Sequence, residues 1–306
     1  MAPSLALHWG VRDVLLFGAG SMLGWSIWRA RGGMDVEGFC NGNTRTLPAG
    51  IDSGIHLDDE LAVALLFKHA QPRLVIHCAG VCDVGICEES PDFAHSVNVT
   101  GTRNLLRYAP AATRIVYLSS DHVFGGASSG SAPYFEDSPA APISCYARTR
   151  VAAEALILAR GNSLVIRSGL WIGPSATGKI GHLDWLRDRH RRGLPMTVVS
   201  DEVRSTVWAE DAGRRVWELA RSPVTGVRHL TATRAVARPE TAAFVNAHFA
   251  IGAVFGVEPR ANRRNPHLGN VELATRYTDA LAQPLPSVIT TPAGSRELAS
   301  ATPHPR

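Results

Sequence analysis

Short apolar runs alternate with segments of helical periodicity over the first 170 residues. The runs predict strands at 11–17, 36–40, 54–57, 74–78, 114–118 and 163–167. Helical spacing of apolar residues predicts helices after the first strand, through Trp28, and at 58–69, 98–108 and 146–160. Strands separated by helices of this length form βαβ crossovers, so the pattern predicts an α/β fold with a doubly wound, Rossmann-type parallel sheet.

The alternation weakens beyond about Trp171, where loops lengthen. Helices are still predicted at 183–192, 209–220 and 239–250. The last stretch, 284–306, is rich in Pro, Ser, Thr and Ala, and we expect it to form a disordered tail.

Composition narrows the class of protein. The chain is 45% hydrophobic with a net charge of only +4, which gives no argument for nucleic-acid binding. It has no apolar stretch long enough to span a bilayer, so no membrane association is expected. The five cysteines are odd in number and show no CxxC spacing. We therefore expect reduced thiols in a cytoplasmic protein and no metal site.

A glycine-rich loop lies between the first predicted strand and helix. It reads Gly18-Ala19-Gly20-Ser21-Met22-Leu23-Gly24. Backbone N–H groups at such a helix start can bind a pyrophosphate, and glycines allow it to approach closely. The loop therefore predicts a dinucleotide site that includes Gly18, Gly20, Ser21, Met22, Leu23 and Gly24, although a simple tight turn is the alternative.

The end of the second strand bears on the choice of cofactor. An acid about 20 residues past the loop would bind the ribose 2′-hydroxyl of NAD. Here the segment around Asn41 has no acid and is followed by Arg45. This favours the 2′-phosphate of NADP, and NAD remains the alternative.

Candidate chemistry gathers between residues 116 and 154. Ser119 and Ser120 follow a strand, and Tyr146 opens a helix with Arg150 one turn later on the same face. A phenol is a weak acid at neutral pH, and a fixed positive charge beside it favours its ionisation. A serine hydroxyl nearby could share the hydrogen bond to a substrate carbonyl. The segment therefore predicts a site of proton transfer.

These motifs together resemble the extended short-chain dehydrogenase/reductases, and within them the dTDP-4-dehydrorhamnose reductase, or sugar-nucleotide-binding, group. The resemblance covers residues 11–280. It rests on Ser119–Gly126, Tyr146–Arg150, Ile76–Gly80, Asn98–Thr102 and the segments at 199–201, 208–211 and 226–230.

The resemblance implies a role for each matched position. Ser120, Tyr146 and Arg150 are expected to be catalytic, with Tyr146 as the proton donor. Further cofactor contacts are expected from His56, Leu57, Asp58, Cys78, Ala79, Gly80, Asn98 and Ser119. Substrate contacts are expected from Val81, Asp83, Ser120, Asp121, His122 and Arg204. Residues 1–170 would bind the dinucleotide, and 171–283 would form a smaller C-terminal α/β substrate domain whose strands could cross back to the first. The expected partner is a nucleotide sugar, and a homodimer is an option.

The chain also departs from the family pattern. Arg150 replaces a lysine, Ser21 a glycine, and His122 a tyrosine. The leading hypothesis is therefore an NAD(P)H-dependent reductase of a ketone, with a 4-keto nucleotide sugar as the expected substrate. The alternatives are an epimerase or tailoring ketoreductase of secondary metabolism, and a non-catalytic NADP-binding regulatory subunit, which Arg150 favours.

Overall fold

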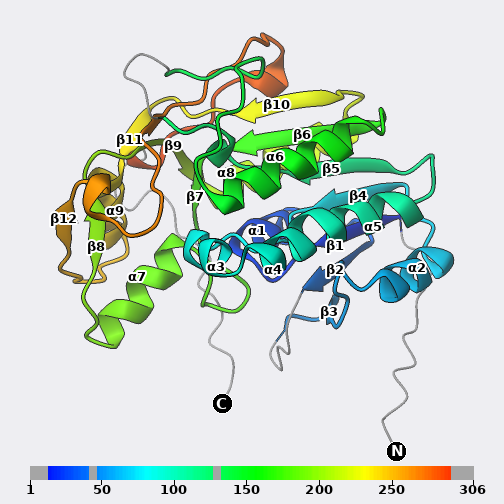
Figure 1. Cartoon of the computed structure of the whole chain (residues 1–306), viewed down its shortest axis with the longest axis horizontal. Coiled ribbons are helices and arrows are strands. Elements are labelled where there is room, and N and C mark those ends of the chain that lie inside the picture. The colour runs from blue at the N-terminus through cyan, green and yellow to red at the C-terminus, as the bar shows by residue number, and fades with distance from the viewer. Residues whose placement is uncertain (1–12, 41–46, 127–131, 291–306) are drawn as a thin grey trace, which may run out of the picture.

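A parallel sheet of seven strands forms the centre of the molecule (Figure 1). The computed structural model describes residues 13–40, 47–126 and 132–290. The strands are β1 (Val14–Phe17), β2 (Val36–Cys40), β3 (Ile51–Ser53), β4 (Leu74–His77), β5 (Arg114–Leu118), β6 (Ser163–Ser168) and β10 (Gly226–Leu230). Their order, β10-β6-β5-β4-β1-β2-β3, reverses between β1 and β4. The predicted doubly wound Rossmann-type sheet is confirmed, and its switch point lies beside the glycine loop.

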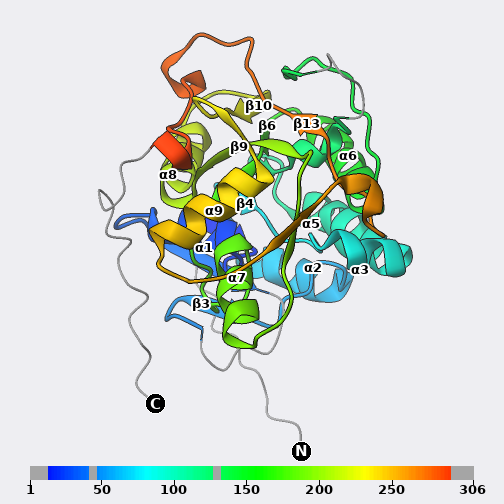
Figure 2. The same ribbon diagram turned by 90° about the vertical axis from the view of Figure 1, so that its left-hand side faces the viewer.

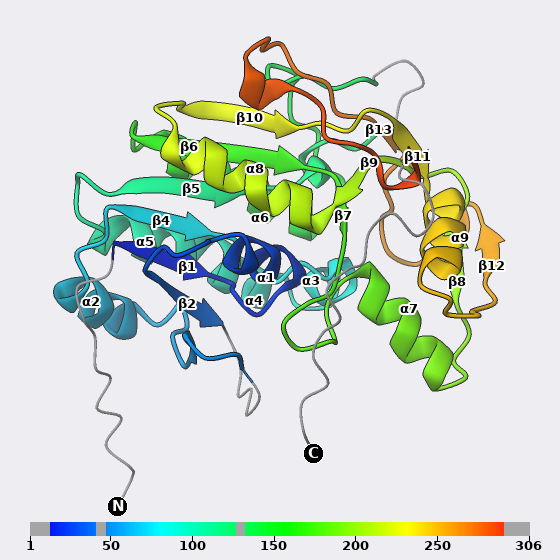
Figure 3. The ribbon, with the colours of Figure 1, turned by 180° about the vertical axis from the view of Figure 1, so that it is seen from behind.

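Helices cover both faces of this sheet, as Figures 1 and 3 show from opposite sides. One face packs against α1 (Met22–Arg29) and α8 (Ala209–Arg221). The other packs against α2 (Glu60–His69), α5 (Gly101–Tyr108) and α6 (Cys145–Leu158). The short α3 (Val84–Glu89), α4 (Pro91–His95) and a π-helical turn at Ser96–Thr100 precede α5. The apolar faces of these helices bury two core layers, one on each side of the sheet.

The third strand differs from the prediction. The expected strand at 54–57 is wrong, because β3 is Ile51–Ser53, paired in register with Gly38–Cys40 of β2. Gly54 follows with a φ of +108°, which ends the extended run. Ile55 and Leu57 are buried in the core without pairing in the sheet, so their apolar alternation reflects burial alone.

A smaller part of the chain lies at the carboxyl ends of the central strands (Figures 2 and 3). It contains the sheet strands β7 (Leu170–Ile172), β9 (Val203–Trp208), β11 (Ala235–Ala237) and β13 (Asn270–Val271), the pair β8 (Thr197–Val199) and β12 (Gly256–Glu258), and the helices α7 (His182–Arg191) and α9 (Arg238–His248). Between β9 and β11 the chain crosses back, because α8 and β10 belong to the central layers.

The predicted tail begins too early in the sequence. Leu285 and Val288 are buried, and Leu285 and Ser287 form β-bridges to Ala232 and Val207. Residues 284–290 are therefore part of the packed structure, and 291–306 lie outside the described residues. Within the described ranges, no helix has the length and apolar character needed to cross a membrane.

Candidate active site

The glycine loop forms one wall of a cavity at the carboxyl end of β1. The cavity has a volume of about 160 Å³ and is lined by Gly18, Gly20, Ser21, Cys40, Cys78, Ala79, Gly80, Thr177 and Ile180. Gly18 has a φ of +89°, and a Cβ there would lie 2.7 Å from the Ala79 nitrogen. Only glycine allows the loop to lie this close to the end of β4.

The start of α1 explains how the altered glycine motif still folds. The Ser21 hydroxyl donates to the Gly18 carbonyl at 2.8 Å and accepts from the Gly24 N–H at 3.0 Å. Ser21 is thus the N-cap of α1, a role that serine fills well. A Cβ on Gly24 would lie 2.1 Å from the Gly18 oxygen, so Gly24 is needed for packing. Met22, Leu23 and Gly24 lie in the first turn and do not line the cavity.

The predicted cofactor residues after β2 and β3 differ in their surroundings. Asn41 and Arg45 lie outside the described residues. His56 is exposed, whereas Leu57 is buried in the core, where its side chain cannot meet a ligand. Asp58 is half-buried and accepts a hydrogen bond from the Ser96 hydroxyl at 3.2 Å. The preference for NADP or NAD therefore remains a prediction.

Tyr146 lies at the start of α6 and is 7% exposed. Ser144 caps this helix by accepting from the Ala147 N–H at 3.1 Å, which fixes the first turn. The Tyr146 ring packs with Cys87, Ala94 and Cys145, and its edge-to-face neighbour is the His122 ring at 5.3 Å. Burial, with Arg204 nearby, lowers the pKa of His122 to about 3, so this imidazole is neutral at physiological pH.

Ser120 caps the short turn that follows β5. Its hydroxyl accepts from the His122 N–H and donates to Asp121 Oδ1, both at 3.2 Å. The neighbouring Ser119 hydroxyl instead donates to Glu154 Oε1 at 2.5 Å, and Glu154 pairs with Arg167 at 2.7 Å. The Ser119 hydroxyl is thus engaged within the core, and the predicted contact of Ser119 with cofactor stays a prediction.

Arg150 is buried beside Tyr146, as one helical turn requires. It is 4% exposed, and its guanidinium carbon lies 5.1 Å from the centre of the Tyr146 ring. A Cβ on Gly80 would lie 2.7 Å from Arg150 Nη2, so the guanidinium reaches the residue that lines the cavity. Its Nη1 donates a hydrogen bond to the Tyr117 hydroxyl at 2.8 Å, a contact that sequence reasoning did not find.

Asn98 links the helices to the end of β4. Its Oδ1 accepts from the Val81 N–H at 2.8 Å, and its Nδ2 donates to the Val81 carbonyl at 3.0 Å and to Thr149 Oγ1 at 2.9 Å. It lies in the π-helical turn, a feature that often marks functional sites. Asn98 therefore acts on the site through the backbone of Val81 and through α6.

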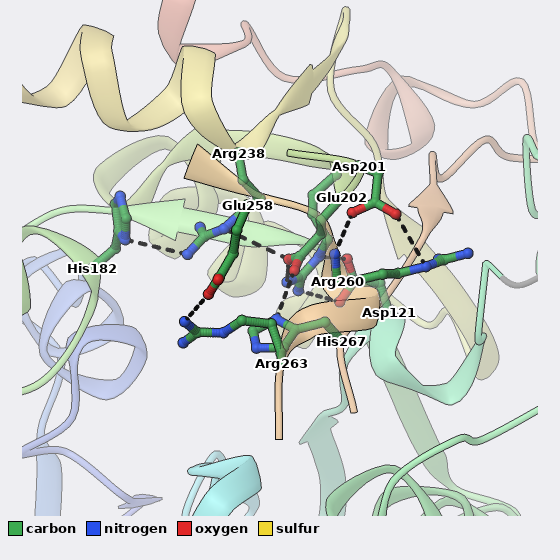
Figure 4. A network of polar contacts seen from close by, with 10 residues as sticks. Asp121, His182, Asp201, Glu202, Arg238, Glu258, Arg260, Arg263 and His267 are labelled. Carbon is green, nitrogen blue, oxygen red and sulfur yellow. Dashed lines mark hydrogen bonds and ion pairs between the residues drawn. The ribbon is translucent and has the colours of Figure 1, made fainter. Parts of the chain in front are cut away.

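A buried ion-pair network joins the turn after β5 to the second part of the chain (Figure 4). Arg204 donates from Nε and Nη2 to the two carboxylate oxygens of Asp121, both at 2.5 Å, and pairs with Glu202 at 3.0 Å. Arg238 approaches Glu202 at 3.6 Å, and His267 approaches it at 3.2 Å. Burial raises the pKa of Asp121, an effect that Arg204 opposes.

The network engages two of the predicted substrate residues. The side chains of Arg204 and Asp121 are 8% and 0% exposed, and their ion pair holds β9 against the loop after β5. Asp83 accepts from the Ile86 N–H at 3.0 Å as the N-cap of α3, and Val81 is fixed by Asn98. The predicted substrate contacts of these residues, of Ser120 and of His122 stay predictions.

Four of the five cysteines are buried, and none of the five, all of which lie in the described ranges, forms a disulfide. The Cys78 thiol donates to the Phe17 carbonyl at 2.9 Å, and burial raises its pKa to about 12. Among the described residues, no group of three or more His, Cys, Asp or Glu side chains is arranged to hold a metal ion.

Comparison with known proteins places this site in a family. The profile of the RmlD substrate binding domain matches residues 12–272. The chain belongs to this family. The dTDP-4-dehydrorhamnose reductase of Mycobacterium tuberculosis is 30% identical over 175 residues, which are 56% of this chain and 56% of that protein. The match thus spans little more than half of that relative's length.

Two further comparisons bear on the fold and on the alternative functions. The dTDP-4-dehydrorhamnose reductase of Bacillus anthracis, solved in complex with NADP, superposes with a TM-score of 0.74 at 18% identity and covers 92% of this chain and 96% of its own. This likeness confirms the fold. Methionine adenosyltransferase 2 subunit beta of Xenopus tropicalis is 36% identical over 105 residues, 34% of this chain and 30% of that protein.

Proposed function

We propose that this protein is an NADPH-dependent reductase of a ketone on a nucleotide sugar, with a 4-keto sugar of the dTDP-4-dehydrorhamnose type as its substrate. The observation that carries the proposal is the buried Arg150, which lies 5.1 Å from the centre of the Tyr146 ring and reaches Gly80 in the wall of the glycine-loop cavity. Membership of the RmlD family supports the same reading.

The residues around the cavity suit a dinucleotide. Gly18, Gly20 and the start of α1 offer close backbone approach for a pyrophosphate. Arg150 presents a buried positive charge where Gly80 lines the cavity, and its N–H groups can donate to ribose hydroxyls. When bound, the reduced nicotinamide supplies the hydride for the ketone carbon.

The side chains of the site supply the proton that the reduced ketone oxygen needs. The Tyr146 phenol donates its proton to the carbonyl oxygen as negative charge develops there. The Ser120 hydroxyl, whose bond to Asp121 is long at 3.2 Å, can turn to donate a second hydrogen bond to that oxygen. The neutral His122 shields the outer edge of the Tyr146 ring.

The test is consumption of NADPH, followed by its absorbance, with a panel of dTDP-4-keto sugars. The wild type should reduce at least one of them, and Tyr146→Phe should lower kcat at least about a hundredfold because the proton donor is lost. NADPH binding should be retained in the variant, since the phenyl ring keeps its packing.

Two results would favour the alternatives. Cofactor binding without consumption of any sugar would favour a regulatory subunit, a reading that Arg150 and the likeness to methionine adenosyltransferase 2 subunit beta support. Interconversion of sugars without net consumption of NADPH would favour an epimerase.

A further inference from the structure

Arg150 is a buried cation with few partners. Within the described ranges it forms no ion pair, and its Nε is buried without a hydrogen-bond partner. Its guanidinium lies between two phenol rings, 5.7 Å from the Tyr117 centre and 5.1 Å from the Tyr146 centre. The hydrogen bond from Nη1 to the Tyr117 hydroxyl, at 2.8 Å, fixes the orientation of the guanidinium. A charge buried in this way is costly unless further partners arrive with a ligand.

Tyr117 provides a rigid and uncharged support. It lies on the central strand β5 and is fully buried. Burial raises its pKa, so the phenol stays protonated and its oxygen acts as a neutral acceptor. It offers Arg150 a hydrogen bond and a ring face without neutralising the charge.

Tyr117 is also in contact with the ring of His77. The His77 ring lies 5.2 Å from the Tyr117 ring, and His77 Nε2 lies 3.0 Å from Thr102 Oγ1. The Thr102 hydroxyl donates its proton to the Asn98 carbonyl at 2.7 Å. His77 must therefore be the donor to Thr102, which fixes its neutral tautomer with the proton on Nε2. Tyr117 thus contacts both a neutral imidazole and the guanidinium.

We propose that Tyr117 is the positioning residue that allows Arg150 to serve where the family has a lysine. Its hydroxyl holds one guanidinium nitrogen, Nη1, so that Nη2 faces Gly80 and the cofactor cavity. The guanidinium of arginine is planar, so a hydrogen bond at one nitrogen also fixes the direction in which another nitrogen donates. The ammonium of lysine lies on a flexible stem, and a single hydrogen bond does not orient it in this way. The inference rests on the proposed function in assigning the cavity to the cofactor.

A double-mutant cycle on Tyr117 and Arg150 tests the proposal. The four proteins are the wild type, Tyr117→Phe, Arg150→Lys and the double variant, and the readout is the Kd for NADPH from a fluorescence titration. Tyr117→Phe keeps the ring and removes the acceptor. We expect it to raise Kd about tenfold or more with Arg150 present, and less than about threefold in the Arg150→Lys background. Equal factors in the two backgrounds would overturn the proposal.

A matched control separates positioning from general stability. Tyr134→Phe makes the same change at another buried tyrosine, stacked on Phe124, and should leave Kd unchanged. A Tyr117→Phe effect seen only in the melting temperature would contradict the proposal.

The outcome can be told apart from that of the proposed function. The cycle reads cofactor binding and needs no ketone. Coupling between Tyr117 and Arg150 in a protein that reduces none of the sugars would sustain this inference and reject the reductase. Turnover of a sugar without any coupling between Tyr117 and Arg150 would support the reductase and reject this inference.

Discussion

Burial keeps several ionisable side chains around the site neutral, and His77 shows this most clearly. Burial, assisted by the nearby Arg150, lowers the pKa of His77 to about 3. In the unfolded chain a histidine titrates near about 6.5. Between these values the unfolded state binds a proton that the folded state does not. The free energy of unfolding therefore falls as the pH drops below about 6.5.

The expected size of this effect can be measured. From about pH 7 to about pH 5, His77 should lower the free energy of unfolding by about 2 kcal/mol. His77→Gln, which can still donate to Thr102, should lose this share of the pH dependence. Urea unfolding of both proteins at the two pH values provides the comparison, and equal losses in both would contradict the assignment.

At the scale of residues, the sequence indicates which side chains belong to the site more readily than it indicates their contacts. Tyr146, Ser120 and Arg150 stand in recognisable motifs, so their proximity could be predicted. Tyr117 and Glu202 carry no local signal, because their contacts arise only when distant strands meet. The same limit applies to Arg204: its position was evident, but its saturation by Asp121 depends on how β9 docks.

Among the elements, α6 is tied to the sheet by a buried ion pair. Glu154 pairs with Arg167 of β6 at 2.7 Å, and their side chains are 5% and 8% exposed. Glu154 also accepts from Ser119, which precedes Ser120. These contacts therefore fix the position of α6, and of Tyr146 at its start, relative to the end of β5.

Removing one partner of this pair should destabilise the protein. Glu154→Gln leaves the Arg167 charge buried without its carboxylate, and we expect a loss of about 3 kcal/mol in the free energy of unfolding. Arg107→Gln, which breaks the exposed pair with Glu60, is the matched control and should have a much smaller effect. Chemical denaturation measures both, and a Glu154→Gln protein as stable as the control would refute this role.

Element boundaries were predictable where periodicity and turn chemistry agreed. β2, β5 and α8 lie within a residue of their predicted ranges, since apolar runs there end at clear breaks. The shift of β3 and the packing of residues 284–290 depend on tertiary pairing that composition does not reveal. The π-helical turn at Asn98 was also hidden, because its residues fit an ordinary helical pattern.

In the whole molecule, the Rossmann sheet and the smaller part meet at the carboxyl ends of β1, β4 and β5 (Figure 3). The glycine loop, Tyr146 and the Arg204–Asp121 pair all lie at this junction. Open parallel sheets bind ligands at this edge, where the strand order reverses. The proposed cofactor would bind to the sheet at this edge, and the proposed substrate would approach from the second part of the chain.

Transfer of deuterium from reduced cofactor to sugar tests this account most directly. The protein would be incubated with dTDP-4-keto-6-deoxy sugars and NADPH carrying deuterium at nicotinamide C4, using both stereoisomers, and the product analysed by mass spectrometry and NMR. We expect one deuterium at sugar C4 from one of the two stereoisomers with wild type, and at least about a hundredfold less with Tyr146→Phe. A protein that binds NADPH but places no deuterium on any sugar of the panel would contradict it.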